Sequence, residues 1–269
     1  MGHRPPAPAM RASGRESGMA LVVALWGTAI LAIVTMSVLD LTRANSRMEH
    51  SGSDAARLGD VADAAINLAI LSMLGPSKTR PPVLGLPFTI TFGGSQARMT
   101  IQDEAGKLDL NFVSVGILEQ MLAASGLDAA QQEAVATRIV ARRKGADAQP
   151  FQSVSALRDV PGITPAAYNW LSSTLTVYAQ TPYLDPTYAS TQVLQVFRTQ
   201  DPSIEARLRD RTDAARGMPA TTPLPGVVLG HAYTITAEVA GLRGARAFRR
   251  AVIRLSGQSS APLLVYEWN

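Results

Sequence analysis

The chain has 269 residues, enough to bury a core as one large domain or two small ones. It contains no cysteine, which excludes disulfides, thiolate catalysis and cysteine-ligated zinc. The formal net charge of +4 leaves nucleic acid and anionic lipid open as partners. The three histidines, His3, His50 and His231, lie too far apart for a local metal motif, so each is predicted to be solvated and no metal site is expected.

The N-terminal region consists of a polar segment followed by an apolar one. Residues 1–18 carry three arginines against one acid, and residues 19–39 contain no charge. At about 1.5 Å per residue, this uncharged run matches the roughly 30 Å hydrocarbon core of a bilayer. Because the arginines precede the run, we expect a single-pass helix with its N-terminus in the cytoplasm and the rest of the chain outside.

Residues 19–39 have three other possible interpretations. A cleaved secretory signal should have a shorter apolar core and an Ala-x-Ala-like exit, whereas this run ends in residues 36–40, Met-Ser-Val-Leu-Asp. A buried globular helix does not fit apolarity sustained over so many turns. An ordinary stop-transfer anchor fits equally well unless the residues before the run carry further information.

The helical spacing continues beyond residue 40. Apolar residues recur at Leu58, Val61, Ala65 and Leu68, and the stripe is widened by Ile66, Ala69 and Met73. Gly75 and Pro76 end the pattern. Residues 19–74 are therefore predicted to form one helix of about 84 Å, whose outer half needs a sheet to cover its stripe.

Strands are predicted on both sides of a helical block. Residues 87–92 and 97–101 alternate around Gly93-Gly94 and predict a hairpin. Helices follow between Ser114 and Leu175, and strands return at 231–239, 246–255 and 263–268. The helix boundaries are marked by an expected cap at Ser114, a capping box at Asp128 and Gln131, and the pair Thr164-Pro165. The predicted fold is α+β, with an antiparallel sheet interrupted by an inserted all-α domain.

Two further patterns occur in the second half of the chain. Residues 185–197 echo residues 109–121 at their Asp, aromatic, Ser and Ile/Val-Leu positions. The two interpretations are a degenerate repeat of one helix start, which we favour, and a chance similarity. Asp201-Pro202 is expected to cap a short charged helix that ends near Gly217. Residues 218–230 contain three prolines and are expected to form a loop.

Enzymatic motifs are missing from the sequence. It contains no Gly-x-Ser-x-Gly elbow, no His-Glu-x-x-His and no phosphate-binding loop. Asp103 and Glu104 are adjacent, so in a strand they would point to opposite faces, and such pairs are usually solvated. We therefore expect no enzyme, no catalytic residue and no cofactor.

Three strings carry a family resemblance. Residues 15–22, Arg-Glu-Ser-Gly-Met-Ala-Leu-Val, resemble a type IV prepilin leader and its junction. Residues 101–111, Ile-Gln-Asp-Glu-Ala-Gly-Lys-Leu-Asp-Leu-Asn, and residues 150–178 resemble the minor pseudopilin K family of type II secretion. The leader resemblance implies that a prepilin peptidase cuts between Gly18 and Met19, leaving a new, methylated N-terminus on the membrane helix. Glycine suits the position because no side chain obstructs an extended backbone in a protease cleft.

Val23 departs from the common pilin pattern. Most pilins and pseudopilins have a glutamate at the fifth mature position, paired with the amino terminus of a neighbouring subunit, and the K family is the one known to omit it. The resemblance therefore implies a tip position. Family members often have an acidic stretch where this chain has residues 141–147, Ala-Arg-Arg-Lys-Gly-Ala-Asp. One aspartate among three cations does not offer the converging oxygens that calcium needs, so no metal site is carried over.

The resemblance implies the following organisation and partners. The segments are a leader (1–18), a transmembrane helix (19–39), the periplasmic part of the long helix (40–75), the first strands (76–110), an inserted helical domain (111–217) and the C-terminal strands (218–269). The expected partners are minor pseudopilins of the I and J types, the prepilin peptidase, the inner-membrane secretion platform and the lipid bilayer. The expected location is the inner membrane, with the C-terminal domain in the periplasm.

A second functional hypothesis rests on residues 160–164, Val-Pro-Gly-Ile-Thr. They resemble the hairpin of helix-hairpin-helix proteins, in which backbone N–H groups hold a DNA phosphate, and Arg138, Arg142, Arg143 and Lys144 could add affinity. However, Thr164 stands where the second glycine is expected, and the last three cations also fit a helix C-terminus. A membrane-anchored DNA-uptake protein is therefore the alternative, and no nucleic acid is the expectation.

Overall fold

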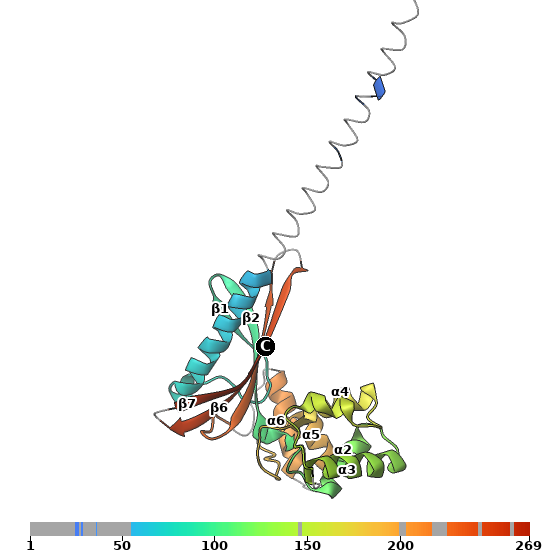
Figure 1. Cartoon of the computed structure of the whole chain (residues 1–269). Coiled ribbons are helices and arrows are strands. Elements are labelled where there is room, and N and C mark those ends of the chain that lie inside the picture. The colour runs from blue at the N-terminus through green and yellow to red at the C-terminus, as the bar shows by residue number, and fades with distance from the viewer. Residues whose placement is uncertain are drawn as a thin grey trace, which may run out of the picture. The chain divides into compact units, whose positions relative to one another are not determined.

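The computed structural model describes Leu25, Trp26, Thr28, Met36 and residues 55–144, 147–198, 203–216, 225–241, 244–258 and 261–269 (Figure 1). The chain divides into two compact units, Met1–Asp54 and Ala55–Asn269. Most of the predicted membrane helix lies outside the described residues, and the account below concerns the second unit.

The second unit contains a five-stranded antiparallel sheet in the order β1-β2-β5-β6-β7. The hairpin predicted around Gly93-Gly94 is confirmed, since Phe88 pairs with Met99 and Phe92 with Ser95. Strands β2 and β5 are neighbours although the whole insertion separates them in the chain. The strands are β1 (Phe88–Phe92), β2 (Ser95–Asp103), β5 (Ala232–Ala240), β6 (Arg246–Gln258) and β7 (Ala261–Trp268).

A helix over residues 55–74 covers one face of this sheet (Figure 1). Its buried side chains share a core with Met99, Ile235 and Ile253 of three strands. The helix residues in that core are Leu58, Val61, Ala62, Ala65, Ile66, Ala69, Ile70 and Met73. The predicted stripe is thus correct except at Leu68, which stays partly exposed, because the buried face is centred on the neighbouring positions.

Polar contacts from the helix reach the far edge of the sheet. Asp63 Oδ1 accepts a hydrogen bond from the indole N–H of Trp268 at 2.8 Å. Its Oδ2 lies 3.3 Å from Nε of Arg249 on β6. The helix ends at the predicted place, where the N–H of Gly75 turns back to the carbonyl of Ser72.

The chain between β2 and β5 forms a helical insertion with its own hydrophobic core. That core includes Leu108 and Leu110 at its beginning and Ile204 near its end. Two short parallel strands pair with each other: β3, which precedes α2, and β4, which follows α4. They hold together the beginning and the end of the segment that contains α2, α3 and α4. The insertion contains η2 (Glu104–Gly106), β3 (Leu108–Asp109), α2 (Val115–Ala124), α3 (Ala129–Lys144), η3 (Val154–Asp159), α4 (Pro165–Thr174), β4 (Leu175–Thr176), α5 (Thr191–Phe197) and α6 (Ser203–Ala215).

Two of the three expected helix caps are confirmed. Asp128 and Gln131 bond reciprocally to each other's backbone N–H, which is a capping box. The Thr164 hydroxyl accepts from the N–H of Ala167 at 3.1 Å, with Pro165 beginning the helix. Ser114 occupies the cap position of α2, but its side chain makes no capping hydrogen bond.

The insertion contains the repeat suggested by the sequence. Each half begins with a turn in which an aspartate accepts from the N–H two residues later: Asp109 from Asn111 at 2.9 Å, and Asp185 from Thr187 at 2.8 Å. In each half the N-cap serine comes five positions after that aspartate. These serines are Ser114 before α2 and Ser190 before α5.

A buried arginine completes each half. Arg143 of α3 donates to the carbonyls of Leu110 and Val113, which lie at the turn before α2. Arg211 of α6 donates to the carbonyl of Thr187, at the turn before α5. In both halves, an arginine of the second helix (α3 or α6) bonds to the turn that precedes the first helix (α2 or α5). This shared arrangement supports the interpretation as a repeat.

The described part of the chain is an α+β structure, with a helix on an antiparallel sheet and an inserted group of helices, as predicted. The part of the expected long helix that precedes residue 55 is, apart from four single residues, outside the described residues.

Candidate functional site

The predicted processing residues Gly18 and Met19, and the position of the missing glutamate, Val23, lie outside the described residues. Of the uncharged run, the described residues are helical, and Leu25, Trp26 and Met36 are exposed. Within the described part of the chain, no helix has the length and apolarity to cross a membrane.

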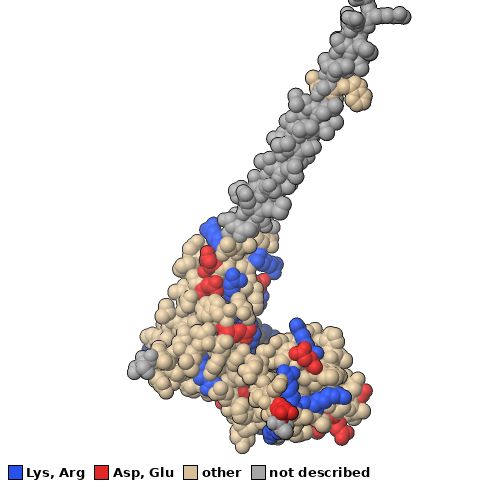
Figure 2. Space-filling model, in the orientation of Figure 1, with Lys and Arg blue, Asp and Glu red and all other residues tan. Residues whose placement is uncertain are grey.

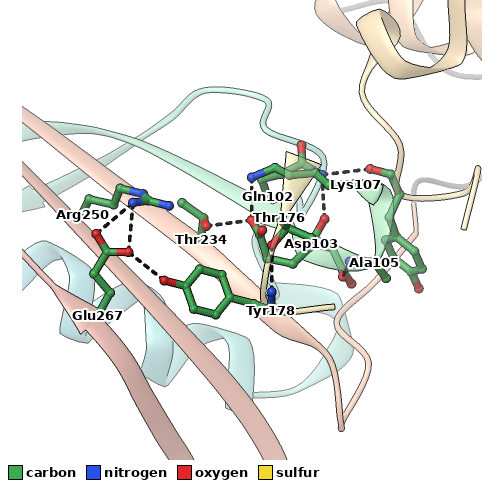
Figure 3. A network of polar contacts seen from close by, with 11 residues as sticks. Gln102, Asp103, Ala105, Lys107, Thr176, Tyr178, Thr234, Arg250 and Glu267 are labelled. Atoms are coloured by element: carbon green, nitrogen blue, oxygen red, sulfur yellow. Dashed lines mark hydrogen bonds and ion pairs between the residues drawn. The ribbon is translucent and has the colours of Figure 1, made fainter. Parts of the chain in front are cut away.

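The described residues bring a network of polar side chains together where the insertion joins the sheet (Figure 3). Asp103, the last residue of β2, is fully buried, and its Oδ2 lies 2.8 Å from Nδ1 of His231, just before β5. Its Oδ1 accepts from the N–H of Ala105 at 2.9 Å. Asp103 therefore links the two ends of the insertion.

The glutamate beside it is buried as well. Glu104 Oε1 lies 2.7 Å from the ammonium of Lys107 and accepts from the Thr234 hydroxyl at 2.7 Å. The expectation that Asp103 and Glu104 are solvated is wrong, because β2 ends between them and each turns inward to its own partners. The interpretation of His231 as a plain solvated histidine is wrong too, since it pairs with Asp103.

The protonation of His231 follows from this pairing. The hydrogen bond to Asp103 raises the pKa of His231 above its ordinary value of 6.5, against an opposing effect of burial. The charges of Asp103 and Asp185 raise this pKa further, and that of Arg254 lowers it. His231 is thus held in its charged form over a wider pH range than a free histidine.

A second part of the network lies at the end of β4. The hydroxyl of Tyr178 donates to Glu267 on β7 at 3.1 Å, and Nη1 of Arg250 lies 2.9 Å from the same carboxylate. Arg254 donates to the backbone carbonyl of Tyr178 at 2.8 Å, and the Tyr178 ring stacks on Tyr266 at 5.4 Å. Burial, and then the charge of Glu267, raise the pKa of Tyr178 to about 12, so its hydroxyl stays a donor at physiological pH.

A cavity of about 280 Å³ lies between these groups. Its four charged lining residues form two ion pairs, Lys107 with Glu104 and Arg250 with Glu267. Serine and threonine hydroxyls make up much of the remaining wall. Since both pairs are compensated internally, the arrangement suits fixing the insertion to the sheet rather than capturing a charged ligand.

The cations of the DNA-binding hypothesis are used within the insertion. Arg138 donates to the carbonyl of Pro161 at 2.9 Å, and the guanidinium of Arg142 lies 4.4 Å from the centre of the Phe151 ring. Arg142, Arg143 and Lys144 lie in the last turn of α3, as predicted; within that turn Arg143 is buried and Lys144 is exposed. On the face that Figure 2 shows, acidic and basic side chains lie next to one another.

Asp109 is a site residue that the sequence reasoning did not single out for a role. Its Oδ1 accepts from the N–H of Asn111, and its Oδ2 accepts from the N–H of Gln180 at 2.8 Å. Burial raises the pKa of Asp109, while those hydrogen bonds and the charge of Arg143 lower it. Only its place in the repeat pointed to it, because the partner Gln180 is 71 positions away.

Within the described residues, no group of three or more potential metal-binding side chains converges. No family model matches the sequence, and no curated protein matches it. Among solved structures, the chain is similar to a chain of "The Crystal Structure of the GspK-GspI-GspJ complex from enterotoxigenic Escherichia coli Type 2 Secretion System". The match covers 85% of this chain and 98% of that one, at 14% sequence identity and a TM-score of 0.49. Similarity at this level does not assign the chain to a family, so a functional assignment depends on the residues of the chain itself.

Proposed function

We propose that this chain is a minor pseudopilin of the K family and occupies the tip of a type II secretion pseudopilus. The observation that carries the proposal is the sheet that buries the apolar face of the helix over residues 55–74 and is interrupted by the helical insertion. In the sequence, that helix follows a leader-like junction and an uncharged run. A helix that leaves a membrane and is covered by a sheet is the arrangement that the resemblance predicts.

The tip position follows from two features. Val23 offers no carboxylate to pair with the amino terminus of a subunit above, and an unpaired carboxylate there would itself cost about 2.5–3.5 kcal/mol in the bilayer. The insertion, fixed to the sheet by buried ion pairs, would fill the space in which a further subunit has to add. A subunit with both features ends a filament rather than extending it.

In this role the chain is a structural subunit and not an enzyme. It is anchored in the inner membrane by residues 19–39, with its N-terminus cytoplasmic and its C-terminal domain periplasmic. Its partners are the I-type and J-type minor pseudopilins along the long helix, the prepilin peptidase and the inner-membrane secretion platform. It needs no cofactor.

Immunogold labelling of sheared pseudopili tests the position. We expect label at one end of each filament for the unmodified protein, and label along the shaft would refute tip placement. Val23→Glu should leave the label at the end, because the insertion still prevents addition.

Removal of the insertion tests its role as a block. A deletion of residues 108–224, bridged by a short Gly-Ser linker, should lengthen the filaments, whereas unchanged length would show that the insertion does not limit addition. The deletion has to include α5 and α6, because Val193, Leu194 and Phe197 belong to the same core as α2 to α4.

The DNA-binding alternative has a direct test as well. Because Arg143 is buried, an alanine variant that includes it would perturb folding, so Arg138→Ala and Lys144→Ala are the useful changes. Fluorescence anisotropy at physiological salt should show weak duplex DNA binding that neither change alters. Sub-micromolar binding that is lost in these variants would favour the DNA-uptake function instead.

A further inference from the structure

Helix α6 carries two arginines on its inner side, Arg207 and Arg211, each with a buried nitrogen that has no hydrogen-bond partner in the described part of the chain. Arg211 is 9% exposed, its Nη2 donates to the carbonyl of Thr187 at 2.6 Å, and its Nη1 is buried without a hydrogen-bond partner. Arg207, one turn earlier, reaches the Thr187 hydroxyl only at 3.4 Å, and its Nε is buried without a partner. Among the described residues, neither arginine forms an ion pair with a carboxylate.

The other half of the repeat shows what is missing. Arg143 holds the first turn as Arg211 holds the second, and burial lowers the pKa of both guanidinium groups. The charge of Asp109 opposes that effect at Arg143. At Arg211, the charge of Arg207 adds to the effect of burial and lowers the pKa to about 10, and Asp210 opposes it more weakly. Asp185, the counterpart of Asp109 in the second half, is not among the charges that shift the pKa of Arg211, where the charge of Arg207 adds to the effect of burial.

Like charges in a buried site are unfavourable unless an opposite charge joins them. The guanidinium group is always charged at physiological pH, so it cannot escape the cost by losing its proton. Its planar set of N–H donors matches the oxygens of phosphate, sulfate or carboxylate. Arg207 is half-buried and keeps contact with solvent, which gives a small anion a route to the pair.

We propose that Arg207 and Arg211, together with the hydroxyl of Thr187, form a binding site for a small oxyanion of the phosphate class. The anion supplies at Arg211 the opposite charge that Asp109 supplies at Arg143. It bonds to N–H groups of both arginines and replaces the long contact between Arg207 and Thr187. The ion comes either from free phosphate or from the phosphate group of an ester, and the two sources share this chemistry.

Thermal unfolding of the full chain in a nonionic detergent tests the site. In millimolar phosphate we expect a Tm about 2–4 °C higher than in sodium chloride of the same ionic strength, because an anion that binds only the folded state stabilises it. Isothermal titration calorimetry with phosphate should give one site per chain. Glycerol 1-phosphate in a parallel titration distinguishes an ester from the free ion: binding of both leaves either source possible, and binding of phosphate alone restricts the site to the free ion.

The variant Arg207→Gln retains the bond between Arg211 and Thr187 but removes the second guanidinium. It should lose the phosphate-induced rise in Tm, and in chloride it should be at least as stable as the unmodified chain, because a like charge has gone. Arg209→Gln, an exposed arginine on the same helix, is the matched control and should keep the full rise. The proposal is overturned if phosphate causes no rise in the unmodified chain, or if Arg207→Gln shows the same rise as Arg209→Gln.

Discussion

His231 and Asp103 lie 2.8 Å apart although 128 positions separate them in the sequence. Asp103 is the last residue of β2, after which the insertion begins, and His231 directly precedes β5, at which the chain returns to the sheet. The Asp103 side chain is fully buried and that of His231 is 28% exposed, so the pair is a partly buried ionic link whenever the histidine is protonated. The pair therefore joins the two ends of the insertion where it meets the sheet.

This link should make stability depend on pH. The pKa of His231 is raised in the folded chain, so protonated His231 stabilises the fold fully below its unfolded value of 6.5. The contribution is lost as pH rises through the higher folded pKa. Urea unfolding at a series of pH values should therefore show a difference between the unmodified chain and His231→Gln that is largest below pH 6.5 and declines above it. A difference that does not change with pH would show that the pair contributes no charge interaction.

Replacement of Arg143 should be far more disruptive than replacement of its neighbour. Arg143→Ala leaves the carbonyls of Leu110 and Val113 and the buried Asp109 without their cation, at an expected cost of about 3–5 kcal/mol in the free energy of unfolding. Lys144→Ala, at an exposed position, should change it by less than about 0.5 kcal/mol. Denaturant unfolding of the two variants measures this contrast, and equal effects would contradict the assigned role of Arg143.

Gly106 and Gly116 should respond oppositely to alanine. A Cβ at Gly106 would lie 2.1 Å from the carbonyl oxygen of Tyr188, so Gly106→Ala should destabilise the fold by about 1–3 kcal/mol. A Cβ at Gly116, in α2, meets nothing within 4 Å, so alanine there should stabilise the helix by up to about 1 kcal/mol. The Tm values of the two variants report the sign directly, and a stable Gly106→Ala would show that the turn before α5 can move away.

Processing at the leader is testable without any structure. Mass spectrometry of the membrane-extracted chain, from a strain with an active prepilin peptidase, should find Met19 at the N-terminus. Gly18→Val should retain the leader, because a β-branched side chain obstructs an extended backbone in a protease cleft. Gly14→Val, within the leader, should be cut normally. An intact leader on the unmodified chain would rule out the prepilin interpretation.

Local sequence patterns predicted the individual elements well. The hairpin before the insertion, the three returning strands, the capping box at Asp128 and the end of the helix at Gly75 all depend on neighbouring residues, and all are observed. The helix stripe was shifted slightly, at Leu68, because helical spacing gives the width of an apolar face but not its centre.

The polar network could not be predicted in this way. Asp103 with His231, Glu104 with Thr234 and Tyr178 with Glu267 join positions that are 128, 130 and 89 apart. No periodicity spans such separations. The same residues therefore looked like ordinary solvated polar groups in the sequence.

The sequence by itself determined the leader-like junction, the uncharged run and the alternation of helices and strands, because hydropathy, caps and turns act between residues a few positions apart. Only the tertiary structure decided which charges are buried and paired. The pairing of β2 with β5 brings the two ends of the insertion together, and this places the charged side chains beside their partners. Asp103, Glu104 and Arg143 are buried with partners inside the protein, whereas Arg207 and Arg211 form no ion pair with a carboxylate among the described residues.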